Sequence, residues 1–236
     1  MNKAFVIAQK ELREYFKSPI AYIVLIVTSI IFNVFFFLII DQNREATLRD
    51  VFQVMEFMFV FIIPLLTMRI FAEEKSAGTM EFLMTTPTSN SAIVLGKYMG
   101  CLAFFSVLVG ISSVYYIILE KFAAPDRWAT LLGYFGVWLE GAFFIAIGLL
   151  ASSWTRNQII GAMGAYMILF SLYFTIGLVE YCKGTLEVIV RYCGTWAHSG
   201  NLFSGILSSA DIVYYISGIV LALLLTRLFV ENRLWR

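Results

Sequence analysis

Long apolar runs separated by short polar segments dominate the chain. Residues 18–40, 98–119 and 157–179 contain no Asp, Glu, Lys or Arg, and two other runs are interrupted by a single carboxylate, Glu56 or Glu140. A helix needs about 20 residues to cross a hydrocarbon core of roughly 30 Å. The pattern therefore predicts membrane-spanning helices at about residues 18–40, 51–70, 95–119, 131–151, 157–179 and 211–230.

Composition supports an all-α polytopic membrane protein with six transmembrane helices, in a single domain over residues 1–236. Hydrophobic residues make up 60% of the chain and charged residues 14%, whereas soluble domains carry about 25% charged residues. No repeat, low-complexity run or long linker divides the sequence. A net charge of +1 argues against a nucleic-acid partner, since binding requires neutralising several phosphates.

Charge placement predicts the orientation. Most Lys and Arg residues fall in segments that lie on the same side of the membrane as the N-terminus, and such residues are retained on the cytoplasmic side. We therefore expect both termini to be cytoplasmic and the protein to be a multi-pass component of the bacterial inner membrane.

Residues 2–17 have the pattern of an amphipathic helix. At 100° per residue one stripe is apolar, and charged residues occupy the opposite face. This pattern favours a helix lying along the inner membrane surface before Pro19 turns the chain into the bilayer; a generic basic anchor is the alternative. The apolar stripe comprises Phe5, Ala8, Leu12, Tyr15 and Phe16.

Residues 69–87 mix exposed charge with large apolar side chains. A glycine break at Gly78 and a stop at Pro87 bound a short segment that carries both acidic and apolar residues. This composition is typical of a surface where a partner protein docks. An ordinary loop packed back on the bundle explains it equally well.

The longest outer connection, residues 180–211, is too apolar for a flexible linker, so we expect it to re-enter the protein or the membrane interface between the fifth and sixth spans. Cys182 and Cys193 both lie here, on the side where disulfides persist. A disulfide between them and two reduced cysteines are the two alternatives.

Catalytic and cofactor motifs are missing from the sequence. It has no GxxxxGK[ST] loop for ATP, and a lone His198 with three cysteines is too little for a metal cluster or a catalytic triad. No metal or cofactor is expected in this chain. Glu140 and Glu56 fall inside apolar runs, where an ionised carboxylate is costly. They are candidates for a transport pathway, the alternative being buried, protonated or hydrogen-bonded groups.

Four stretches together resemble the ABC-2 permease family, particularly its branch of gliding-motility and copper-enzyme-maturation permeases. The first runs from Lys10 to Tyr22 and looks like the family's elbow helix. The others are residues 69–97, residues 152–158, and His198 with the residues that precede the last span. The motif in residues 69–97 consists of Glu73, Glu74, Lys75, Gly78, Thr79, Glu81, Leu83, Pro87, Gly96 and Lys97.

The resemblance implies a non-catalytic permease subunit that pairs with a second copy or a homologous permease. A separate ABC ATPase would bind ATP and Mg²⁺, and an extracytoplasmic subunit would be a further partner beside membrane lipid. ATP hydrolysis would drive export or mechanical work. A secondary, ion-coupled transporter and a structural membrane anchor are the competing functions. The residues expected to couple to the ATPase are Glu73, Glu74, Gly78, Thr79, Glu81, Phe82 and Leu83.

Overall fold

The chain is built from helices. The computed structural model describes residues 3–43, 45–79, 88–179, 181 and 183–232, and within these ranges it contains no strand. The predicted all-α class is therefore confirmed. The helices are α1 (Lys3–Lys17), α2 (Pro19–Asn43), α3 (Arg49–Thr67), α4 (Arg69–Ser76), α6 (Asn90–Ser112), α7 (Val114–Phe122), α8 (Arg127–Trp154), α9 (Gln158–Tyr173), α10 (Thr175–Val179), α11 (Thr185–Cys193), α12 (Trp196–Phe203) and α13 (Ser209–Asn232).

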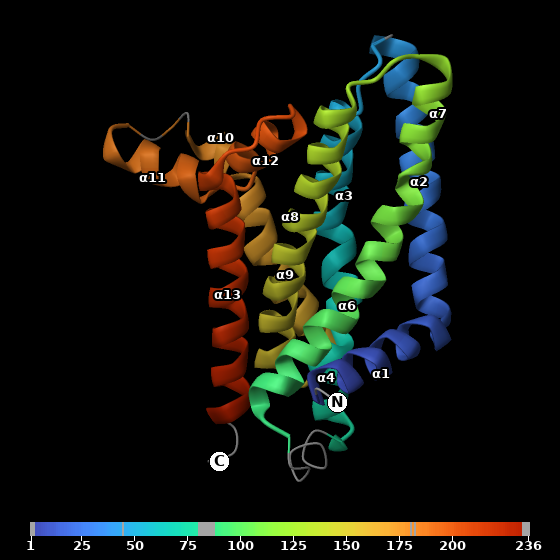
Figure 1. Cartoon of the computed structure of the whole chain (residues 1–236). Helices are drawn as coiled ribbons and strands as arrows, with labels where there is room; N and C mark the ends of the chain where they lie inside the picture. The colour runs from blue at the N-terminus through green and yellow to red at the C-terminus, as the bar shows by residue number, and fades with distance from the viewer. Residues whose placement is uncertain (1–2, 44, 80–87, 180, 182, 233–236) are drawn as a thin grey trace.

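Helix α8 forms the centre of the bundle and contacts α3, α6, α9, α12 and α13 (Figure 1). Its glycines permit this close packing. A β-carbon at Gly133 would overlap the ring of Phe52 on α3, and one at Gly141 would overlap Phe105 on α6. Because α8 is surrounded, most of its residues are buried.

Two of the long helices are interrupted. Pro64 lies inside α3, and its carbonyl accepts a 2.9 Å hydrogen bond from the amide of Met68, where α3 gives way to α4. Proline cannot donate a backbone hydrogen bond, so α3 also lacks the bond from residue 64 to the carbonyl of Val60, one turn earlier. The third predicted span is likewise divided, at Ser113 between α6 and α7.

Among the described residues, five helical stretches are long and apolar enough to cross a membrane: α2, α3 with α4, α6 with α7, α8 and α13. The polytopic class is thus confirmed. Helix α9, in the fifth predicted span, has only 16 residues before the chain turns at Phe174 into α10. Six crossings therefore stay a prediction. The start of α1 and the end of α13 lie at one end of the bundle, called here the α1 end, and α12 lies at the other, the α12 end (Figure 1).

Helix α1 crosses α6 and buries only part of its apolar stripe against the bundle. Ala8 and Tyr15 of the stripe are buried, whereas Phe5 is 58% exposed and Glu11 is only 6% exposed. A polar contact with Lys97 accounts for the burial of Glu11 against α6. The position of α1 along the inner membrane surface stays a prediction.

Candidate functional site

A cleft with a volume of about 700 Å³ lies between α1 and α4 at the α1 end of the bundle. A third helix, α6, forms the base of the cleft and supplies Lys97. Helices from three distant parts of the sequence therefore meet there. The lining is strongly charged, and its side chains belong to the two segments that resemble a permease coupling region. The lining residues include Lys10, Glu11, Glu14, Arg69, Glu73, Glu74, Thr79 and Lys97.

Lys97 is the central cation of the cleft and is 1% exposed. Its ammonium nitrogen lies 2.8 Å from Glu11 Oε1 on α1, 2.8 Å from Glu74 Oε1 on α4 and 3.1 Å from the carbonyl oxygen of Ile70. A buried charge is tolerated only when it is paired and hydrogen-bonded in this way. Lys97 therefore joins α1, α4 and α6 in one polar cluster.

Glycine makes this approach of α1 to α6 possible. A β-carbon at Gly96 would lie 2.6 Å from the Cβ of Ile7 and 2.7 Å from the carbonyl oxygen of Ala4, both on α1. Such contacts are too short for carbon, so a larger residue would push the helices apart. Gly96 thus allows α1 to lie close to α6, and the next residue, Lys97, is the cation buried between them.

Burial and neighbouring charges raise the pKa values of two residues on α1, but burial acts on them in opposite directions. Burial raises the pKa of the Glu11 carboxyl group above its ordinary value of 4.5, although the attraction of Lys97 opposes the shift. For Lys10, burial lowers the pKa, but the attraction of Glu14, Glu11 and Glu74 is larger in sum and leaves the pKa raised. The shift of the Glu11 pKa thus follows from burial, whereas that of the Lys10 pKa follows from the summed attraction of the acidic groups around it.

The predicted coupling residues differ in their accessibility. Glu74 faces inward, paired with Lys97, and its second oxygen has no hydrogen-bond partner within the described ranges. Glu73 is exposed. Gly78 has a φ of 71°, a conformation that glycine adopts at little cost, and the hydroxyl of Thr79 donates to the carbonyl of Glu74 over 3.3 Å. The remaining predicted residues, Glu81, Phe82 and Leu83, lie outside the described residues.

Helix α4 is also attached to the centre of the bundle. The hydroxyl oxygen of Ser152 on α8 accepts hydrogen bonds from the amides of Phe71 (3.1 Å) and Ala72 (3.2 Å), and the hydroxyl donates to the carbonyl of Met68 (2.9 Å). Lys75 donates to the carbonyl of Ser153. Ser152 thus satisfies backbone groups that the start of a helix leaves free. Sequence reasoning did not assign it this role, because the contact joins residues about eighty positions apart.

Two carboxyl groups meet inside the bundle. Glu56 on α3 is 1% exposed and Glu140 on α8 is 0% exposed, and the two groups interact directly. The Ser199 hydroxyl on α12 donates a 3.0 Å hydrogen bond to Glu56, whereas the Glu140 oxygens receive none from donors in the described part of the chain. Two adjacent ionised carboxylates in an apolar core are strongly disfavoured, so a shared proton fits this geometry.

The connection between α9 and α13 has an ordered polar centre. His198 Nδ1 lies 2.7 Å from Asp211, and its Nε2 lies 3.0 Å from the carbonyl oxygen of Tyr192. The side-chain amide of Asn201 donates to Asp211 over 3.1 Å. These bonds fix α12 against the start of α13. The predicted re-entrant segment therefore returns to the bundle through α12, whereas α11 has no buried residue.

Only one of the two cysteines in this connection is among the described residues. Cys193 is exposed at the end of α11 and has no disulfide partner among the described residues, and Cys182 lies outside them. The disulfide between them is therefore untested and stays a prediction.

A family model described as "ABC-2 family transporter protein" matches residues 5–190. The matched range includes α1, α4 and α6, which form the charged cleft, and both carboxyl groups inside the bundle. A search of curated proteins finds no match.

Proposed function

Since the chain belongs to the ABC-2 transporter family, we propose that it is the permease subunit of an ATP-binding cassette transporter and that a separate ATPase docks in the cleft between α1 and α4. Proteins of this family generally form the membrane channel rather than catalyse a reaction, and they normally work with an ABC ATPase. The ATPase would bind ATP and Mg²⁺, because this sequence has no phosphate-binding loop. In this proposal the α1 end is cytoplasmic.

The observation that carries the proposal is the division of the cleft into a buried base and an exposed rim. Lys97 bonds to both Glu11 and Glu74, so the three residues hold α1 and α4 to α6. Glu14 and Glu73 line the rim and remain exposed. A partner can therefore contact the rim without breaking the buried pairs, and exposed acids there favour a basic partner surface.

The buried cluster also suggests how movement reaches the membrane. When ATP closes the ATPase pair, a displacement of α1 or α4 is transmitted to α6 through Lys97 and to α8 through Ser152. Such a change requires contacts that differ between two states of the complex. A pair of these permeases, as two copies or as a heterodimer, would place the moving helices around a pathway that performs export or mechanical work.

Two charge reversals test the docking site. Glu14→Lys with Glu73→Lys should weaken co-purification of the co-expressed ATPase about tenfold or more, since two attractive contacts become repulsive. Glu231→Lys is the matched control: it lies near the end of α13, away from the cleft, and should leave ATPase binding unchanged. Equal ATPase recovery with the double variant and the wild type would show that the partner docks elsewhere.

The buried carboxyl pair favours a second candidate function, ion-coupled secondary transport. A protonatable pair inside apolar helices is the kind of group that such transporters use. In the permease proposal the same pair lines the pathway, and Glu140→Gln alters ATP hydrolysis linked to transport while preserving assembly. Reconstituted protein that moves substrate with a pH gradient and without any ATPase would favour the secondary transporter instead.

A further inference from the structure

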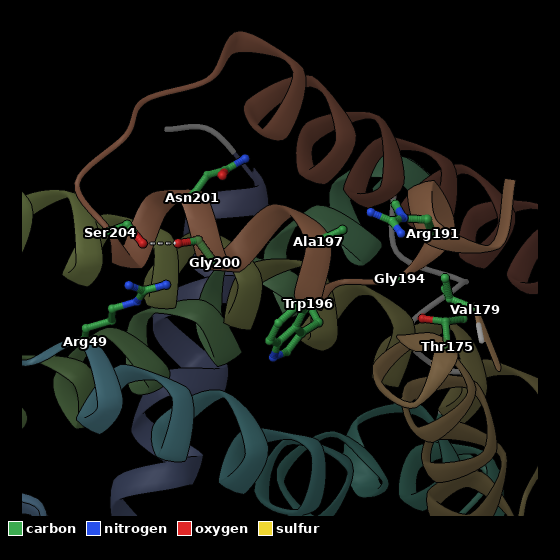
Figure 2. A pocket seen from close by; sticks show the side chains of 10 residues that line it. All are labelled: Arg49, Thr175, Val179, Arg191, Gly194, Trp196, Ala197, Gly200, Asn201 and Ser204. Carbon is green, nitrogen blue, oxygen red and sulfur yellow. Dashed lines mark hydrogen bonds between the residues drawn. The ribbon is translucent and has the colours of Figure 1, made fainter. Parts of the chain in front are cut away.

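A second pocket, with a volume of about 440 Å³, lies at the α12 end of the bundle. Four elements surround it: the start of α3, the end of α10, the end of α11, and α12 (Figure 2). Helix α3 is far from the other three in the sequence, and the bonds of His198 and Asn201 to Asp211 hold α12 in place beside them. The pocket lies far along the bundle from the ATPase cleft, so the proposed coupling function does not use it.

Two arginines make the pocket cationic. Arg49 comes from α3 and Arg191 from α11, and none of the described lining residues is acidic. The Arg49 guanidinium has no ion pair within the described parts of the chain. Among the described residues Arg191 pairs only with Glu187, one turn away on the same exposed helix and 3.4 Å distant. An exposed pair of this kind is weak, so no described residue competes strongly with an anion for either guanidinium group.

The remaining wall combines one further donor with apolar surface. In the view of Figure 2 the indole of Trp196 lies between the two arginines, and its N–H has no acceptor among the residues that the structure describes. Val179 and Ala197 add apolar lining. The hydroxyls of Thr175 and Ser204 already donate to the carbonyls of Leu172 and Gly200. The free donors are therefore the arginines and the indole, which suit a phosphate oxygen better than a neutral polar ligand.

The neighbouring surface indicates that this phosphate belongs to a lipid. Helix α11 has no buried residue, and its apolar side chains Leu186, Val188, Ile189 and Tyr192 are all more than half exposed. An apolar helix surface at the end of a membrane bundle fits the interface between headgroups and acyl chains, where Trp and Tyr also gather. A soluble anion would make no use of this surface.

We propose that the pocket formed by α3, α10, α11 and α12 binds the headgroup of an anionic phospholipid, with Arg49 and Arg191 as the cations on its two sides (Figure 2). The acyl chains lie along the exposed apolar side of α11, and the Trp196 indole lies between the two arginines. The lipid thereby fastens α11, which has few protein contacts of its own, to the start of α3.

Native mass spectrometry of the purified full-length chain tests the site with defined lipids. Phosphatidylglycerol should bind the wild type, and Arg49→Gln with Arg191→Gln should weaken this binding about tenfold or more, since two charge-assisted contacts are lost. The double Lys variant keeps the charge but loses the guanidinium forks, so an intermediate affinity is expected. Arg127→Gln is the matched control, an exposed arginine on α8 that pairs with Glu120 outside the pocket.

Three outcomes would overturn the proposal. The first is equal binding of phosphatidylglycerol by the wild type and the double Gln variant, with both eluting as the same folded species in size-exclusion chromatography. The second is glycerol phosphate competing as well as the intact lipid, which would assign the pocket to a free phosphate. The third is loss of a co-expressed extracytoplasmic protein in the double Gln variant without any change in lipid binding, which would assign it to a protein partner.

Discussion

The ammonium nitrogen of Lys97 lies 2.8 Å from a carboxylate oxygen of Glu11, and both side chains are almost completely buried where α1 crosses α6. The two residues are 86 positions apart in the sequence. Because Glu74 shares the same ammonium group, the contact links the segment before the first span to the segment after the second. The regions proposed to contact the ATPase therefore form one unit with α6.

Loss of the central cation should destabilise this unit. Lys97→Met leaves the buried Glu11 carboxylate without its partner and leaves Glu74 with the more distant Lys10, at 3.9 Å, so we expect the free energy of unfolding to fall by about 3–5 kcal/mol. Thermal unfolding of the purified chain measures the effect, with Lys17→Met on α1 as the exposed control. Adding Glu11→Gln and Glu74→Gln removes the unpaired charges and should restore part of the stability. An unchanged melting temperature for Lys97→Met would contradict the central role of this cation.

The raised pKa of Glu11 predicts a specific pH dependence. The folded chain holds this proton to a higher pH than the unfolded chain does, so it binds more protons in the window above 4.5. Stability from this group therefore falls as the pH rises through that window. Relative to Glu11→Gln, the wild type should lose thermal stability from pH 4.5 upward. If its relative stability instead rises, the attraction of Lys97 outweighs burial.

Glu56 and Glu140 should behave as a coupled pair. In a double-mutant cycle with Glu56→Gln and Glu140→Gln, the two effects on unfolding should differ from additivity by about 0.5–3 kcal/mol, because each carboxyl group senses the proton of the other. Glu140→Gln combined with Glu120→Gln is the control, since Glu120 is an exposed residue paired with Arg127. Additivity for the buried pair would mean that the groups titrate independently.

Ser152→Ala should loosen α4. The substitution removes the acceptor of two buried amides and the donor to Met68, and each buried group left unsatisfied costs about 1–3 kcal/mol. Amide hydrogen exchange in residues 69–76 should therefore accelerate. Ser171→Ala, on the exposed part of α9, removes only a bond to its own helix and should leave this exchange unaffected. Unaltered protection of α4 in Ser152→Ala would show that the loop after α4 is sufficient to hold it.

The membrane-spanning helices were predictable from the sequence, because long apolar runs leave water readily and then have to form helices. In an apolar environment the backbone must bond to itself, so uninterrupted runs such as residues 18–40 indicate helices directly. The burial of Glu11 was not predictable from hydrophobic periodicity, because its partner Lys97 comes from a distant helix. The contact of Ser199 with Glu56 spans 143 positions, and no local pattern announces it. Helix α9 is shorter than predicted because the chain turns at Phe174. The turn lies inside an unbroken apolar run, so the sequence pattern gives no sign of it.

Ser152 bonds to the interruption at Met68 and to the helix that follows it: its hydroxyl donates to the carbonyl of Met68, and its oxygen accepts from two amides of α4. An interruption bonded to a neighbouring helix in this way is a poor hinge, because bending it would expose buried amides. A force applied to α4 would then displace α8 with it. A passage through this protein would open by sliding whole helices past one another, and its rate would depend on how easily the lipid around them yields.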